Sequence, residues 1–193
     1  MQSDFKNFDW EGLIKSLPTQ KTDEDKAKRK DLWDRMDANQ NGYLSLAEFD
    51  GAVRDVLKLP KIFPHKKVIT RAYKDAKNKI KGKAKHSDDY VEWLEFRYLL
   101  INLRQYFECY VMFCRVDLSN DFKIKLDEFK KALSKFKKWG AKINDPAAEF
   151  KKLDTNNSGS IMFDEFCEFA IQKNLDLEDD DDFDASELTN FKG

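Results

Sequence analysis

The chain is poor in residues that cross-link or interrupt a fold: its 193 residues include three Cys, four Pro, seven Gly and two His. The cysteines (Cys109, Cys114 and Cys167) are odd in number and lack the close spacing of a metal site, so we expect reduced thiols in a cytoplasmic protein. No apolar run resembles a signal peptide or is long enough to cross a bilayer. The scarcity of Gly and Pro, with 16 Phe and four Trp to fill a core, favours an all-helical fold.

The formal net charge of −1 conceals two segments of opposite charge. Residues 58–85 hold eleven Lys or Arg against one acid, Asp75, whereas residues 176–187 hold eight acids and no base. The spacing of apolar residues between 69 and 80 predicts that the first segment contains a basic amphipathic helix. Its basic side chains are a candidate site for anionic lipid head groups: Lys66, Lys67, Arg71, Lys74, Lys77, Lys79 and Lys81. Two other interpretations stay open, a solvated face and a binding site for the acidic tail.

Two twelve-residue stretches, 37–48 and 154–165, carry oxygen-bearing side chains at alternate positions, a glycine at position 6 and a glutamate at position 12. Calcium prefers six to eight oxygen ligands, and a loop with this spacing supplies them from positions 1, 3, 5, 7, 9 and 12. The side chains and carbonyls in those places are Asp37, Asn39, Asn41, Tyr43 (carbonyl), Ser45 and Glu48 in the first stretch. In the second they are Asp154, Asn156, Ser158, Ser160 (carbonyl) and Glu165. The two stretches therefore predict EF-hand calcium sites.

Calcium-binding hands of this kind occur in pairs, so each strong loop should have a partner. Residues 117–128 are the expected partner of the last loop, because Ile124 and Ile161 both hold position 8, where paired loops join through a short two-stranded ribbon. Its candidate ligands are Asp117, Ser119, Asp121, Lys123 (carbonyl) and Glu128. Phe122 replaces the glycine and Lys125 stands at position 9, so whether this loop binds calcium is left open.

Residues 84–95 are the expected partner of the first loop, with Val91 opposite Leu44 at position 8 and Glu95 at position 12. Ala84 stands where the leading aspartate belongs, which removes the ligand that starts the site. We therefore expect this hand to support the fold without binding calcium, and His86 to be an ordinary loop histidine.

These features predict an all-α fold of four EF-hand helix–loop–helix units paired into two lobes. An extra N-terminal helix would fall in residues 1–21 and the N-terminal lobe in residues 22–103. The C-terminal lobe would occupy residues 104–175 and the acidic tail residues 176–193.

The sequence resembles the calflagin family, the flagellar calcium-binding proteins of trypanosomes. The resemblance depends on the order of strong and degenerate hands and on the segments VEWLEFRYLL, FKKALSKFKKWGAKIND and GSIMFDEF. It implies a calcium sensor that associates reversibly with the flagellar membrane through N-terminal acyl groups and basic residues. It also implies that the third hand binds calcium without its glycine, and that the first hand is weak. Gln2 stands where the acylated glycine would be, so we expect a cytoplasmic, flagellar or ciliary protein without N-terminal acylation.

Each strong loop has only two carboxylates among its chelating positions, which favours binding on the order of 10⁻⁷–10⁻⁵ M, the range of calcium sensors. We expect a non-enzymatic sensor with Ca²⁺ as its only cofactor and a protein target or an anionic membrane as its partner. The alternatives are a calcium buffer and a calcium-triggered, photoprotein-like enzyme. The sequence shows no set of convergent polar groups for a chromophore and no nucleophile beside a histidine. It also lacks the aromatic residues between basic ones that are typical of nucleic-acid binding.

Overall fold

The computed structural model describes residues 9–77, 79–80, 86 and 89–175. The acidic tail, Lys81, Ala84 and the residues before Asp9 lie outside the described residues, so the expectations that concern them stay untested.

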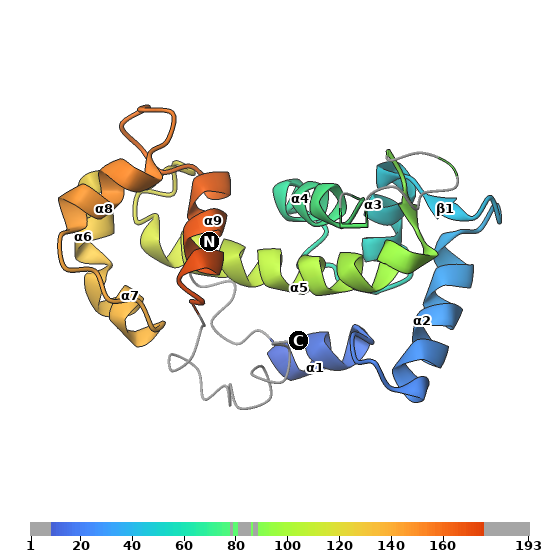
Figure 1. Ribbon diagram of the computed structural model, residues 1–193. Helices are drawn as coiled ribbons and strands as arrows, with labels where there is room; N and C mark the ends of the chain where they lie inside the picture. The colour runs from blue at the N-terminus through green and yellow to red at the C-terminus, as the bar shows by residue number, and fades with distance from the viewer. Residues whose placement is uncertain (1–8, 78, 81–85, 87–88, 176–193) are drawn as a thin grey trace. The chain divides into compact units, whose positions relative to one another are not determined.

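Helices dominate the described part of the chain, and the two strands are two residues each (Figure 1). The elements, in order, are α1 (Trp10–Ser16), α2 (Asp23–Met36), β1 (Tyr43–Leu44), α3 (Leu46–Asp55), α4 (Lys66–Lys77), β2 (Val91–Glu92), α5 (Trp93–Val116), α6 (Leu126–Lys131), α7 (Leu133–Lys138), α8 (Pro146–Leu153) and α9 (Phe163–Gln172). The all-α prediction is confirmed. None of the described helices is long and apolar enough to span a membrane.

The described chain divides into two compact units, and the division falls between Phe107 and Glu108, inside α5. We call residues 9–107 the N-terminal unit and residues 108–175 the C-terminal unit. Each unit contains two helix–loop–helix segments, and the N-terminal unit also contains α1, the extra helix that the sequence predicts.

In the N-terminal unit, β1 and β2 form an antiparallel ribbon in which Leu44 lies opposite Val91. Both side chains are fully buried, which fixes the register because a shift by one residue would expose them. The predicted pairing of the two loops at position 8 is confirmed.

An aromatic core fills the C-terminal unit. Phe129 and Phe136 lie 4.9 Å apart between ring centroids, and Phe169 lies within 6.0 Å of both. Ile124 and Ile161 exchange two backbone hydrogen bonds of 3.0 and 2.8 Å, which confirms the second predicted pairing. The Phe residues of the exit helices thus form a core, and no bound group is needed to explain them.

The three cysteines are buried as thiols, in agreement with a packing role. Burial raises the pKa of the Cys114 thiol to about 11, which makes it a poor nucleophile at neutral pH.

Candidate calcium-binding loops

Loop 37–48 connects α2 to α3 and gathers its oxygen atoms around its own backbone amides. Oδ1 of Asp37 and Oδ1 of Asn39 both accept the amide of Asn41, at 3.1 and 3.0 Å. The second carboxylate oxygen of Asp37 accepts the amide of Gly42 at 3.0 Å. Positions 1 and 3 of the motif therefore converge on one point, as two ligands of a single ion must.

The glutamate at position 12 joins the same cluster. Glu48 lies in the first turn of α3, where one carboxylate oxygen accepts the backbone amide of Ser45 at 2.8 Å and its hydroxyl at 2.7 Å. The other oxygen accepts the side-chain amide of Asn39 at 2.8 Å. This capping box holds Glu48 against positions 3 and 9, so the donor set of hard oxygens that the motif requires lies together.

Loop 154–165 repeats this arrangement between α8 and α9. Oδ1 of Asp154 and Oδ1 of Asn156 both accept the amide of Ser158, at 2.8 and 2.9 Å, and Oδ2 of Asp154 accepts the amide of Gly159 at 2.8 Å. Glu165 accepts the amides of Thr155 and Met162, at 3.0 and 2.9 Å. Asp154, Asn156 and Ser158 thus converge as their counterparts do in the first loop, whereas Glu165 is held by Thr155 at position 2 and not by position 3.

Both strong loops place glycine where the backbone needs it. Gly42 has φ of 86° and Gly159 has φ of 78°, in the left-handed region that glycine enters without steric cost. This turn lets the backbone amide of the glycine at position 6 donate to the aspartate at position 1 of the same loop.

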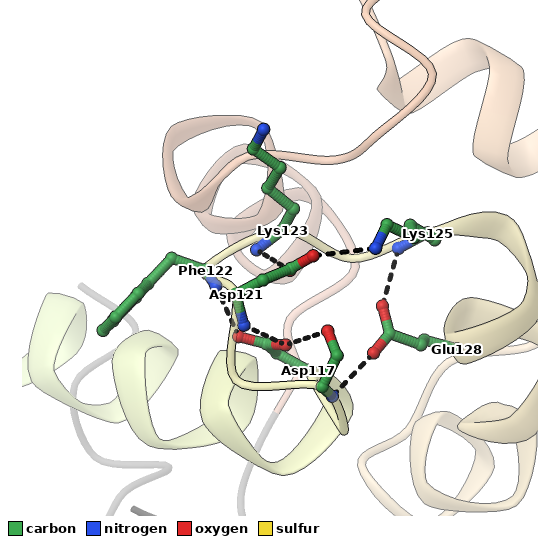
Figure 2. Close-up of polar contacts among 7 residues, drawn as sticks. Asp117, Asp121, Phe122, Lys123, Lys125 and Glu128 are labelled. Carbon is green, nitrogen blue, oxygen red and sulfur yellow. Dashed lines mark hydrogen bonds and ion pairs between the residues drawn. The ribbon is translucent and has the colours of Figure 1, made fainter.

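Loop 117–128 reaches the same backbone geometry without glycine (Figure 2). Phe122 has φ of 60°, and its amide donates to Oδ2 of Asp117 at 2.9 Å. Glu128 accepts the amides of Ser119 and Lys125, each at 2.9 Å. Figure 2 shows the ring of Phe122 pointing away from the carboxylates, and its side chain is 41% exposed.

Lys125 places a positive charge in this third loop. Its ammonium lies 2.8 Å from a carboxylate oxygen of Asp121, the residue at position 5 (Figure 2). This hydrogen bond lowers the pKa of the Asp121 carboxyl and raises the pKa of Lys125. One of the three candidate carboxylates is therefore already paired with a cation.

The carboxylates of each loop are too few to surround a calcium ion, so oxygen atoms of Asn, Ser and the main chain have to supply the remaining ligands. Within the described residues, no three His, Cys, Asp or Glu side chains gather closely enough to hold a metal by themselves. The mixture of a few carboxylates with neutral oxygens fits a hard cation such as calcium.

Comparison with known proteins agrees with this geometry. The model of the FCaBP EF-hand domain matches residues 13–103, and the model of the EF-hand domain pair matches residues 106–171. The flagellar calcium-binding protein of Trypanosoma cruzi is 39% identical over 175 residues, which are 90% of this chain and 83% of that protein. The chain belongs to the flagellar calcium-binding protein family. It is an EF-hand protein, and it binds calcium.

Other matches are partial or distant. Flagellar calcium-binding protein TB-44A of Trypanosoma brucei brucei is 38% identical over 184 residues, which are 93% of this chain and 45% of that longer protein. Calcium-loaded apo-aequorin from Aequorea victoria matches with a TM-score of 0.30 and 21% identity, over 78% of this chain and 91% of that chain.

The remaining hand of this family member, 84–95, is described only at residues 86 and 89–95. Glu95 is buried, and one of its carboxylate oxygens accepts the amide of Glu92 at 3.2 Å. His86 lies in this loop with an exposed side chain, and it contacts both loops of the pair. Its backbone amide and its Nδ1 lie 2.8 and 3.1 Å from a carboxylate oxygen of Glu92, and its ring lies 5.1 Å from that of Tyr43.

The basic amphipathic helix is α4, which ends at Lys77, so Lys79 lies beyond it. Its buried face carries Ile69, Tyr73 and Ala76, as the spacing predicts, but Ile80, which the same spacing includes, lies beyond the helix and is only half-buried. The basic face is partly engaged within the protein, because four side chains of the proposed lipid patch contact other residues. These pairs are Lys66 with Asp50 at 2.7 Å, Lys77 with Asp89 at 3.1 Å, Arg71 over the ring of Tyr106 at 5.2 Å, and Lys79 over the ring of Tyr98 at 5.9 Å.

Proposed function

We propose that this protein is a calcium sensor whose primary sites are loops 37–48 and 154–165. Loop 117–128 is a weaker third site, because Lys125 competes with the ion for Asp121. The hand at 84–95 binds no calcium. Each primary loop has two carboxylates in its donor set, which favours binding on the order of 10⁻⁷–10⁻⁵ M.

The main support for a sensor function is the position of the glutamates at position 12 of the two primary loops. Glu48 and Glu165 lie in the first turns of α3 and α9, directly before Phe49 and Phe166. Both phenylalanines are fully buried. A shift of either glutamate towards an ion therefore moves a helix that is anchored in a core, and in sensor hands such a movement exposes apolar surface.

A protein target is the partner that we favour, because exposed apolar surface suits an amphipathic helix of another protein. An anionic membrane surface is the second partner, and it would use Lys67, Lys74 and Lys79, which are exposed. The ion pairs of Lys66 and Lys77 reduce the charge available to a membrane. The names of the relatives support a location in the flagellum.

We favour a binding protein over a photoprotein-like enzyme, because the polar side chains gathered in the described loops are those of the calcium motif. The nearer alternative is a buffer, which would bind calcium without opening.

A dye that fluoresces when it binds exposed apolar surface distinguishes a calcium sensor from a calcium buffer. The full chain should show a rise in dye fluorescence when calcium is added. The variant with Glu48→Gln and Glu165→Gln should show none, because glutamine keeps the helix cap but removes the charged bidentate ligand. If the full chain binds calcium but the dye signal stays flat, the protein is a buffer and the sensor proposal is wrong.

A further inference from the structure

A buried tyrosine of the hand that lacks a calcium site contacts the first calcium loop. Tyr73 lies on α4 and is 3% exposed. Its hydroxyl lies 2.8 Å from the carbonyl oxygen of Leu44 and 3.0 Å from that of Asp89, so its single hydrogen is shared between one carbonyl of each paired loop. Burial raises the pKa of Tyr73 to about 12, so the hydroxyl keeps its proton at neutral pH.

Leu44 stands between two residues of the donor set. Tyr43 supplies the carbonyl at position 7, and Ser45 holds position 9. The Leu44 side chain is fully buried, so a hydrogen bond to its carbonyl fixes the backbone between these two positions.

Two rings of the same hand, those of Tyr90 and His86, pack against residues 42–43 of the first calcium loop. The ring of Tyr90 stacks on that of Tyr43 with 4.2 Å between centroids, and the ring of His86 lies 5.1 Å from it. A Cβ atom added to Gly42 would lie 3.3 Å from the His86 ring. The sixth and seventh positions of loop 37–48 are thus covered by aromatic side chains of the partner hand.

We propose that α4 and the described residues of loop 84–95, which belong to one hand, act as a brace that sets the calcium affinity of loop 37–48, with Tyr73 of α4 as the principal positioning residue. The inference rests on the proposed function, since it assumes that loop 37–48 is a site. A loop with two carboxylates gains little from charge, so its affinity depends on how rigidly its neutral oxygens are held. A loop held in place before the ion arrives loses less conformational entropy on binding.

The experiment follows the two primary loops separately in the intact chain. The amide of Gly42 donates to Asp37 and the amide of Gly159 donates to Asp154, so their NMR signals report on the two loops during one calcium titration. Tyr73→Phe should weaken binding at Gly42 about fivefold, the effect of one lost hydrogen bond, and leave the midpoint at Gly159 unchanged.

Tyr106→Phe is the matched control. Tyr106 belongs to the same unit, is 4% exposed and donates its hydroxyl to Asp75, which is not a loop ligand. It should lower stability as Tyr73→Phe does, but it should leave the Gly42 midpoint within about twofold. His86→Ala, at a partly exposed position, provides a second variant, with about threefold weaker binding at Gly42.

Equal Gly42 midpoints in the unaltered chain, Tyr73→Phe and His86→Ala would overturn the brace and leave the calcium site intact. If the NMR signal of the Gly42 amide does not change when calcium is added to the unaltered chain, both the calcium site and the brace are overturned. The two failures are therefore distinguishable.

Discussion

Loops 117–128 and 154–165 belong to one unit and share one backbone path, although only the second fits the calcium motif closely. In both, the first aspartate accepts the amides of positions 5 and 6. Position 6 has φ of 60° in Phe122 and 78° in Gly159. The loops differ in side chains, with Lys125 in one where Met162 stands in the other. The two loops therefore share the position-1 carboxylate and the Ile124–Ile161 pairing, and we propose that the charge at position 9 separates them as calcium sites.

Removing the charge of Lys125 should make the loops more alike, and this is the largest effect that we expect within the comparison. Lys125→Ser should raise the calcium affinity of loop 117–128 about tenfold, because it frees Asp121 and removes a cation from beside the site. The affinity is measured from the NMR shift of the Phe122 amide during a calcium titration.

Lys123→Ser is the control for this substitution. It removes the same charge two residues away, from a side chain that Figure 2 shows pointing away from the carboxylates. If both variants raise the affinity equally, the general charge of the loop matters and the Lys125–Asp121 pair does not.

Phe122→Gly tests whether the backbone at position 6 of loop 117–128 is strained, and we expect its effect to be smaller than that of Lys125→Ser. A non-glycine residue with φ of 60° is strained, so glycine should raise the free energy of unfolding of the C-terminal unit by about 1 kcal/mol. The change is measured by urea unfolding. Asn120→Gly is the control, because Asn120 has φ of 58° but asparagine tolerates this region. A loss of stability in Phe122→Gly would show that the exposed ring makes contacts that outweigh the strain.

The calcium motif and its pairing could be predicted from the sequence because their signals are local. Twelve consecutive residues specify each loop, and position 8 names its partner across the ribbon, as Leu44 and Val91 illustrate. The apolar face of α4 was likewise predictable, since Ile69, Tyr73 and Ala76 recur at helical spacing.

What the sequence does not reveal depends on contacts between distant residues. Tyr73 meets the carbonyl of Leu44 across 29 positions, and no periodic pattern distinguishes a tyrosine that bonds to a loop from one that only fills a core. The ion pair of Lys66 with Asp50 spans 16 positions, so the sequence alone does not show that this lysine is already paired and less available to a membrane. The interaction of His86 with Tyr43 also needs the folded pairing of two loops.

Calcium titration calorimetry on the intact chain tests the central claim most directly, because it counts the ions bound. The account predicts two ions in the tighter class, a third bound more weakly, and loss of both tighter ions in the variant with Glu48→Gln and Glu165→Gln. The same variant retaining two tightly bound ions would contradict the assignment of loops 37–48 and 154–165 as the primary sites.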